Sequence, residues 1–175
     1  RVLLRSANNA MKAAAWLGVL KAGGIAVATM PLLRAQELSY MLEKARVQFA
    51  LCDGRLRDEL EKAAPAAPGL KTAYFHSDAA DSLEARMARQ SGTFDNVIPS
   101  HDDVALIAFT SGTTGLPKGT IHFHRDVLAI ADCMARPHVG RIRRRYRVMR
   151  MIVVRIRGRR TAIAGWRFFA AAALA

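Results

Sequence analysis

Short apolar runs alternate along this chain with longer stretches in which apolar residues recur every three or four positions. Apolar runs bounded by turn residues are typical of buried strands, and apolar residues at helical spacing are typical of helices packed on one side. The alternation predicts an α/β fold, a mostly parallel sheet flanked by helices. The predicted strands are Val2–Leu4, Ile25–Thr29, Val47–Cys52, Leu70–Phe75 and Val104–Phe109, with Thr120–Phe123 as a candidate sixth.

Capping and breaking residues set the limits of the predicted helices. Asn8 or Asn9 caps the first, because a short polar side chain accepts a hydrogen bond from a free N–H of the first turn. This helix ends before Gly23-Gly24, and its only charges are Lys12 and Lys21, so we expect most of its surface to be covered. The other predicted helices are Gln36–Ala45, Arg55–Ala64 at the surface, Ser82–Gln90, and His124–Ala135 with Val127, Leu128, Ile130 and Ala131 facing inward.

The predicted strand Val104–Phe109 leads directly into Thr-Ser-Gly-Thr-Thr-Gly-Leu-Pro-Lys-Gly. Glycines allow close backbone approach, successive N–H groups form an anion-binding concavity, and hydroxyls with one lysine add donors for phosphate. The stretch is not a Walker A loop, because Gly119 rather than Ser or Thr follows Lys118. Sheets of this class bind ligands beyond the carboxyl ends of their strands. We therefore interpret the stretch as a polyphosphate loop rather than an ordinary surface loop.

The stretch Phe109–Gly119 resembles the signature phosphate loop of the adenylate-forming (AMP-binding) superfamily, which includes acyl-CoA synthetases, peptide-synthetase adenylation domains and luciferases. Thr120–Asp132 resembles the strand and helix that follow that loop. More narrowly, the amino-acid sequences of Ile107–Asp132 and Val27–Arg34 are similar to those of aromatic-acid CoA ligases of the 2-aminobenzoate and benzoate type. The resemblance covers residues 1–139, which we expect to form part of a large N-terminal AMP-binding domain.

The resemblance implies an ATP-dependent, AMP-forming acid–CoA ligase. Such an enzyme joins a carboxylic acid to ATP, releases pyrophosphate and passes the acyl group to CoA, so ATP, Mg²⁺, CoA and an aromatic acid such as benzoate are the expected small molecules. It also implies that Mg²⁺ lies near the hydroxyl of Thr113 or Thr114. The predicted ATP-phosphate residues are Thr110, Ser111, Gly112, Thr113, Thr114, Gly115, Lys118 and Gly119.

No residue of this chain is assigned a catalytic role. The family's ribose-binding acid and its C-terminal lysine have no counterpart among the 175 residues, so we expect this chain to be inactive by itself. A nucleotide-binding module without ligase activity remains an alternative. The opening Arg1 is interpreted as an internal cut, since a strand is already under way there.

Charge is distributed unevenly between two parts of the chain. The formal net charge is +13, yet residues 1–140 carry 16 Lys+Arg and all 14 Asp+Glu, whereas residues 141–175 carry 11 Arg and no acid. Residues 140–175 therefore form a second, Arg-rich segment to which the resemblance does not extend. Three interpretations stay open: an arm for nucleic acid or anionic membranes, an amphipathic basic segment, and a segment read out of frame or disordered. We favour the third, because composition and resemblance change together.

Other chemistry-bearing side chains give weaker signals. Cys52 and Cys133 lie in apolar surroundings, which indicates buried reduced thiols and fits a cytoplasmic protein. His122 and His124 are two apart and would share one face of a strand, but no third ligand is placed for a metal. Trp16 is interpreted as a core residue, as is Phe123. No apolar run is long enough to span a bilayer, so no membrane partner is expected.

Overall fold

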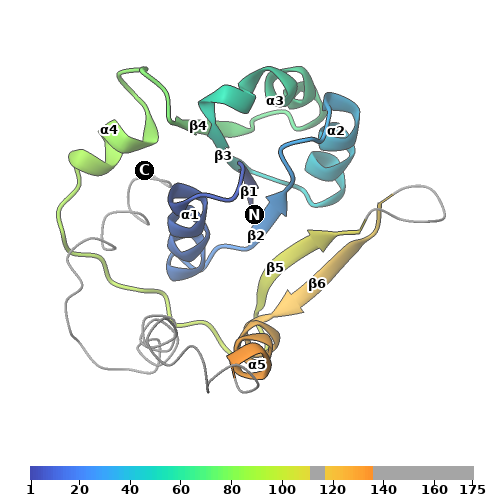
Figure 1. Cartoon of the computed structure of the whole chain (residues 1–175), viewed down its shortest axis with the longest axis vertical. Helices are drawn as coiled ribbons and strands as arrows, with labels where there is room; N and C mark the ends of the chain where they lie inside the picture. Colours follow the sequence, from blue (N-terminus) through green and yellow to red (C-terminus); the bar gives the residue numbers. More distant parts are fainter. Residues whose placement is uncertain (111–116, 136–175) are drawn as a thin grey trace.

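A computed structural model of the chain describes residues 1–110 and 117–135. They form one six-stranded sheet with the order β4-β3-β1-β2-β5-β6 (Figure 1). The pairs β4–β3, β3–β1, β1–β2 and β2–β5 are parallel, and β5–β6 is antiparallel. The strands are β1 (Val2–Arg5), β2 (Ala26–Thr29), β3 (Phe49–Asp53), β4 (Lys71–Phe75), β5 (Val104–Phe109) and β6 (Gly119–Phe123).

The mostly parallel α/β sheet confirms the fold predicted from the sequence. Element limits differ from the predicted ones by only a few residues, the usual uncertainty at element ends. The helices are α1 (Ala10–Lys21), α2 (Ala35–Lys44), α3 (Arg57–Ala63), α4 (Leu83–Ala88) and α5 (His124–Ala135).

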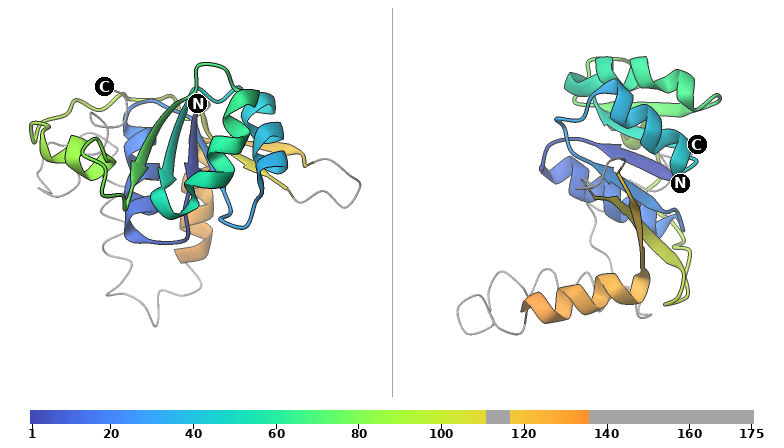
Figure 2. Two further views of the ribbon diagram at one scale, coloured as in Figure 1. Left: turned by 90° about the horizontal axis from the view of Figure 1, so that it is seen from above. Right: turned by 90° about the vertical axis from the view of Figure 1, so that its right-hand side faces the viewer.

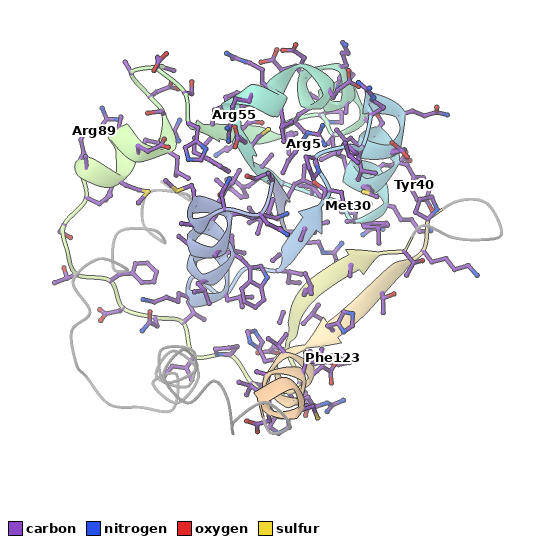
Figure 3. The ribbon with its side chains drawn as sticks, viewed as in Figure 1. Arg5, Met30, Tyr40, Arg55, Arg89 and Phe123 are labelled. Atoms are coloured by element: carbon purple, nitrogen blue, oxygen red, sulfur yellow. The ribbon has the colours of Figure 1, made fainter. Side chains whose placement is uncertain are left out.

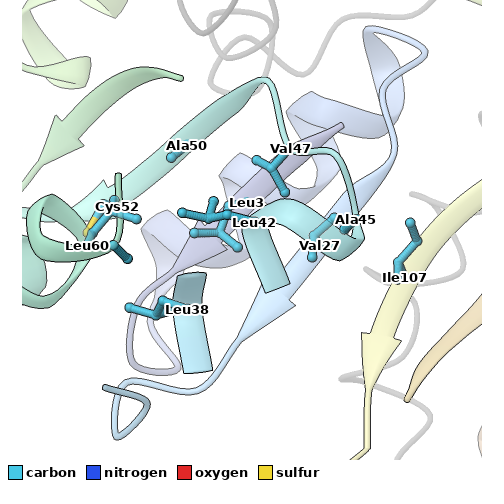
Figure 4. Close-up of a cluster of buried hydrophobic side chains, with 11 residues drawn as sticks. Leu3, Val27, Leu38, Leu42, Ala45, Val47, Ala50, Cys52, Leu60 and Ile107 are labelled. Atoms are coloured by element: carbon cyan, nitrogen blue, oxygen red, sulfur yellow. The ribbon is translucent and has the colours of Figure 1, made fainter. Parts of the chain in front are cut away.

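Helices cover both faces of the sheet. On one face, α1 and α4 pack through Ala15, Val19 and Leu83 against apolar side chains of β1, β3 and β4. On the other, α2 and α3 pack through Leu38, Leu42 and Leu60. The apolar cluster on the α2–α3 face is shown in Figure 4; it includes Leu3, Val27, Ala50, Cys52 and Ile107. Because both faces are covered, the strands read as continuous apolar runs rather than as alternating patterns.

Two helix starts follow the capping rules. Asn9 is the N-cap of α1, and its Oδ1 accepts a hydrogen bond from Lys12 N at 2.8 Å, which resolves the choice between Asn8 and Asn9. The α5 helix begins directly after β6, where Asp126 Oδ2 accepts from Phe123 N at 2.8 Å. Since a carboxylate near a helix N-terminus is favourable, Asp126 stabilises the sharp strand-to-helix change.

The α5 helix corrects one sequence prediction. It lies at the end of β6 and extends away from the sheet (Figure 2), attached by hydrogen bonds from His124 N to Asp103 O and from Arg125 N to His101 O, both at 3.0 Å. Leu128 and Ile130, predicted to face inward, are 39% and 55% exposed. Val127 and Ala131, the other two residues predicted to face inward, are half-buried, so the described part of the chain covers only part of the apolar side of this helix.

The turn after α1 depends on glycine. Gly23 has a φ of +73°, and a Cβ built there would lie 2.8 Å from Val97 Cγ1. Gly69 has a φ of +86° with nothing within 4 Å of an added Cβ. We expect Gly23→Ala to lower the free energy of unfolding by about 2 kcal/mol and Gly69→Ala by about 1 kcal/mol, because only the first adds a clash to the backbone strain. Urea denaturation followed by circular dichroism measures both, and equal losses would contradict the Val97 contact.

No helix in the described ranges is long and apolar enough to cross a membrane.

Candidate functional site

Three polar residues, Asp53, Arg5 and Thr29, lie at the edge of the sheet where its parallel strands end. In spatial order, the last residues of these strands are Phe75, Asp53, Arg5, Thr29 and Phe109. The strands β1 and β3 are neighbours whose connections run in opposite directions, β1 towards β2 and β3 towards β4. Ligands of open α/β sheets bind at such an edge, close to the point where the connections diverge.

The predicted phosphate loop is the connection between β5 and β6, at this same edge. Thr110 N donates to Lys118 O at 3.0 Å, so the two ends of the loop are held together. Lys118 is exposed, and its ammonium group has no hydrogen-bond or ion-pair partner among the described residues. A cation that is not engaged elsewhere is suited to phosphate. The predicted contacts at residues 111–115, including both candidate Mg²⁺ neighbours, lie outside the described residues.

Thr110 plays a part in this geometry that the sequence did not indicate. Its backbone N–H and its hydroxyl both point to Lys118 O, the second at 3.4 Å. In this arrangement Thr110 has no donor left for a phosphate oxygen, since threonine carries one hydroxyl proton and one amide proton. Its observed contacts close the loop, and its predicted contact with ATP stays a prediction.

Arg5 organises the edge between β1, β2 and β3. Arg5 lies at the end of β1, close to Met30 (Figure 3). It is 1% exposed, and its side chain donates to four main-chain carbonyl oxygens. The acceptors are Leu56 O at 3.2 Å, Met30 O at 3.3 Å, Pro31 O at 3.2 Å and Leu33 O at 2.9 Å. Burial lowers the pKa of the guanidinium group, the expected direction for a cation removed from water. The charge at the end of Val-Leu-Leu-Arg gave no sign of this role, because strand-terminal charges are usually solvated.

Asp53 is the centre of a second polar cluster. Its carboxylate is 1% exposed and accepts from Arg55 Nη2 at 2.6 Å and Arg55 Nε at 2.8 Å. His76 Nδ1 lies 3.1 Å from Asp53 Oδ2, and Ser6 Oγ lies 3.5 Å from it. The hydrogen bonds from Arg55 hold the pKa of Asp53 well below its ordinary value, against the opposing effect of burial. The group is therefore an ionised structural carboxylate that joins the ends of β1, β3 and β4.

Two open clefts adjoin this edge. One, of about 420 Å³, has Leu4, Lys12, Trp16 and Ala28 among its lining residues. Lys12 Nζ donates there to Ser6 O at 2.9 Å and to Thr29 O at 3.2 Å. The other, of about 330 Å³, lies beside α3 and is lined by Arg5, Pro31, Leu32, Leu33, Arg34, Arg55, Leu56, Asp58, Glu59 and Lys62. Neither cleft includes Thr110 or Lys118, so the site hypothesis rests on the β5–β6 geometry.

The cysteine and histidine predictions are partly wrong. Cys52 is buried, and burial raises the pKa of its thiol to about 12, but Cys133 is exposed because it lies on α5. His122 ends up in β6 whereas His124 begins α5, so the two do not share a strand face. Among the described residues, no group of three or more His, Cys, Asp or Glu side chains is placed to hold a metal ion.

Comparison with known proteins identifies the family. The profile described as AMP-binding enzyme matches residues 1–152. The chain belongs to the AMP-binding enzyme family. Among curated relatives, the benzoate–CoA ligase of Thauera aromatica is 32% identical over 126 residues, which are 71% of this chain and 24% of that protein. The chain spans about a quarter of the length of this relative.

Solved structures agree with the fold. The anthranilate CoA ligase AuaEII, determined in complex with anthranoyl-AMP, has a TM-score of 0.68 at 25% identity, over 75% of this chain and 26% of that one. A long-chain-fatty-acid–CoA ligase from Archaeoglobus fulgidus has a TM-score of 0.70 at 24% identity, over 77% of this chain and 27% of that one. Both place the described sheet within the adenylate-forming fold.

Proposed function

We propose that this chain supplies the ATP-phosphate loop of an ATP-dependent, AMP-forming acid–CoA ligase. The observation that carries the proposal is the closed base of the β5–β6 loop, which leaves the ammonium group of Lys118 exposed beyond the carboxyl end of β5. The family match spans this region, and one structural relative, MatB from Rhodopseudomonas palustris, was solved with ATP bound.

The chemistry assigned to the full enzyme is acyl transfer through an adenylate. A carboxylate oxygen attacks the α-phosphorus of ATP, the bond to the bridging oxygen breaks, and pyrophosphate leaves with that electron pair. The acyl group then passes from AMP to the thiol of CoA. The principal need in the first step is stabilisation of charge on the phosphates, which preorganised donors and cations provide. In this chain Lys118 balances negative charge on the β- and γ-phosphates, and Thr110 keeps the loop closed.

We further propose an aromatic acid as the substrate class. The support is the names of the relatives: benzoate–CoA ligase, the hydroxybenzoate–CoA ligases and the anthranilate CoA ligase. The ammonium group of Lys118 also suits ATP that carries Mg²⁺, because the lysine and the metal would each neutralise part of the phosphate charge.

We expect no acid-dependent ATP–pyrophosphate exchange from the 175-residue chain alone, and exchange above background would overturn that expectation.

Removal of the lysine tests the phosphate assignment. We expect Lys118→Ala to weaken ATP binding at least tenfold, equivalent to about 1.4 kcal/mol, because a charge-assisted phosphate contact is lost. Isothermal titration calorimetry of the purified chain with ATP measures the change. Lys44→Ala is the matched control, since Lys44 is an exposed lysine in the last turn of α2.

The same titration distinguishes the effect of the positive charge at residue 118 from the effect of the shape of its side chain. Lys118→Arg retains the positive charge and should recover most of the affinity, with the usual fall as salt is added. If Lys118→Ala and Lys44→Ala bind ATP equally well, the phosphate assignment is wrong.

A further inference from the structure

An aromatic contact links α2 to the base of the phosphate loop. Tyr40 projects from α2 towards the tip of β5 and β6 (Figure 3), and its ring centroid lies 6.4 Å from that of Phe109 at an interplanar angle of 73°. This edge-to-face arrangement is a favourable geometry for two aromatic rings. The α2 helix is itself fixed to the sheet, because Leu38, Met41 and Leu42 are buried. Tyr40 therefore reaches Phe109 from a rigid support.

Phe109 in turn lies against the far side of the loop base. It is the last residue of β5 and pairs across the ladder with Gly119, the first residue of β6. A Cβ built on Gly119 would lie 3.5 Å from Phe109 Cε1 and 3.4 Å from Ile107 Cγ2. The ring thus covers the place where Gly119 has no side chain. The next residues towards the loop are Thr110, which follows Phe109, and Lys118, which precedes Gly119. These two make the hydrogen bond that closes the loop.

We propose that Tyr40 is a positioning residue for the phosphate loop, acting through Phe109 on the Thr110–Lys118 closure. This inference rests on the proposed function, because it concerns the same loop. The β5–β6 pair is the edge of the sheet, with no strand beyond β6 in the described residues. An edge hairpin has a neighbour on one side only, so its tip needs support from a face. Among the described aromatic residues, Tyr40 supplies that support on the α2 face.

Loss of the ring should loosen the loop without removing any group that touches ATP. We expect Tyr40→Ala to raise the Kd for ATP about three- to tenfold and to accelerate hydrogen exchange at the Thr110 amide, read by NMR on the full chain. Tyr40→Phe keeps the ring and should stay within twofold of the original Kd, with the exchange rate unchanged. That rescue distinguishes ring packing from any role of the hydroxyl.

A second tyrosine provides the control for general destabilisation. Tyr74 lies on β4, at the opposite edge of the sheet, where its hydroxyl donates to Glu61 Oε1 at 3.2 Å. Tyr74→Ala should lower the melting temperature as Tyr40→Ala does, but should leave both the Kd for ATP and the exchange rate at Thr110 unchanged. Equal effects of the two alanine variants on Kd and exchange would overturn the positioning role.

The outcomes separate this inference from the proposed function. If Lys118→Ala weakens ATP binding and Tyr40→Ala does not, Tyr40 has no positioning role and the phosphate assignment stands. If Lys118→Ala has no effect, the phosphate assignment fails, and the role of Tyr40 in it fails with it. If both variants weaken binding, and Tyr40→Phe restores it, both proposals are supported.

Discussion

Replacement of Arg5 by alanine is expected to lower the free energy of unfolding by about 4 kcal/mol, which is a large part of the stability of a typical domain. The side chain is buried and donates to four carbonyl oxygens in two loops that follow β2 and β3. Loss of the donors removes the guanidinium partner of all four carbonyls, of which Met30 O keeps a hydrogen bond from Leu33 N at 3.4 Å, and the removed side chain leaves a cavity. The segment from Met30 to Leu33 should lose its fixed position as a result.

Two further substitutions separate the causes of this loss. Arg5→Met keeps most of the volume and removes all donors, so it should cost about 3 kcal/mol if the hydrogen bonds dominate. Arg89→Ala is the control, because Arg89 is exposed, and a change within about 0.5 kcal/mol is expected. Urea denaturation followed by far-ultraviolet circular dichroism measures all three variants. A loss below 1 kcal/mol for Arg5→Met would show that the four hydrogen bonds contribute little.

Replacement of Asp53 by asparagine is expected to lower the free energy of unfolding at pH 7 by about 3 kcal/mol. The ionised carboxylate accepts two charge-assisted hydrogen bonds from Arg55 and lies beside His76, in a position where only 1% of it is exposed. An amide is neutral and offers one acceptor oxygen instead of two, so at least one Arg55 contact is lost. The NH₂ group of the amide also points a donor at the guanidinium group.

The pH dependence of this loss has a defined sign. Because the pKa of Asp53 is lower in the folded protein than in the unfolded chain, its ionisation stabilises the fold above the unfolded pKa of about 4. This contribution is lost as the pH falls below that value towards the folded pKa. The difference in unfolding free energy between the original chain and Asp53→Asn should therefore be constant from pH 7 to about pH 5 and shrink towards pH 3. A difference that grows on acidification would contradict the ion pair.

Local pattern was sufficient for most of the secondary-structure elements. Apolar runs predicted the strands β1 to β5, because a strand covered on both faces needs apolar residues at successive positions, whereas β6, which is partly polar and largely exposed, was only a candidate. Asn9 and the Gly23-Gly24 pair gave the first helix its limits through capping and backbone freedom. The run from Phe109 to Gly119 indicated phosphate chemistry through residue types alone, and Lys118 lies beyond a strand end as that interpretation requires.

The partners of individual side chains could not be predicted in this way. Leu128 and Ile130 were assigned to the interior because they lie on an apolar helix side, and Cys133 because its surroundings in the sequence are apolar, yet all three are exposed. Amphipathic spacing shows which side of a helix is apolar, but it does not show whether another element packs there. The predicted start of the last helix at His124 is confirmed, and it is this start that separates His124 from the strand face of His122.

The sequence by itself determined the α/β order and the resemblance to adenylate-forming enzymes, because both depend on residues adjacent in the chain. Only the tertiary structure decided that Arg5 supports the loops after β2 and β3, that Asp53 meets His76, and that Tyr40 meets Phe109. Parallel strands bring together residues 20 to 70 positions apart. Such contacts depend on strand order and register, which no local periodicity specifies.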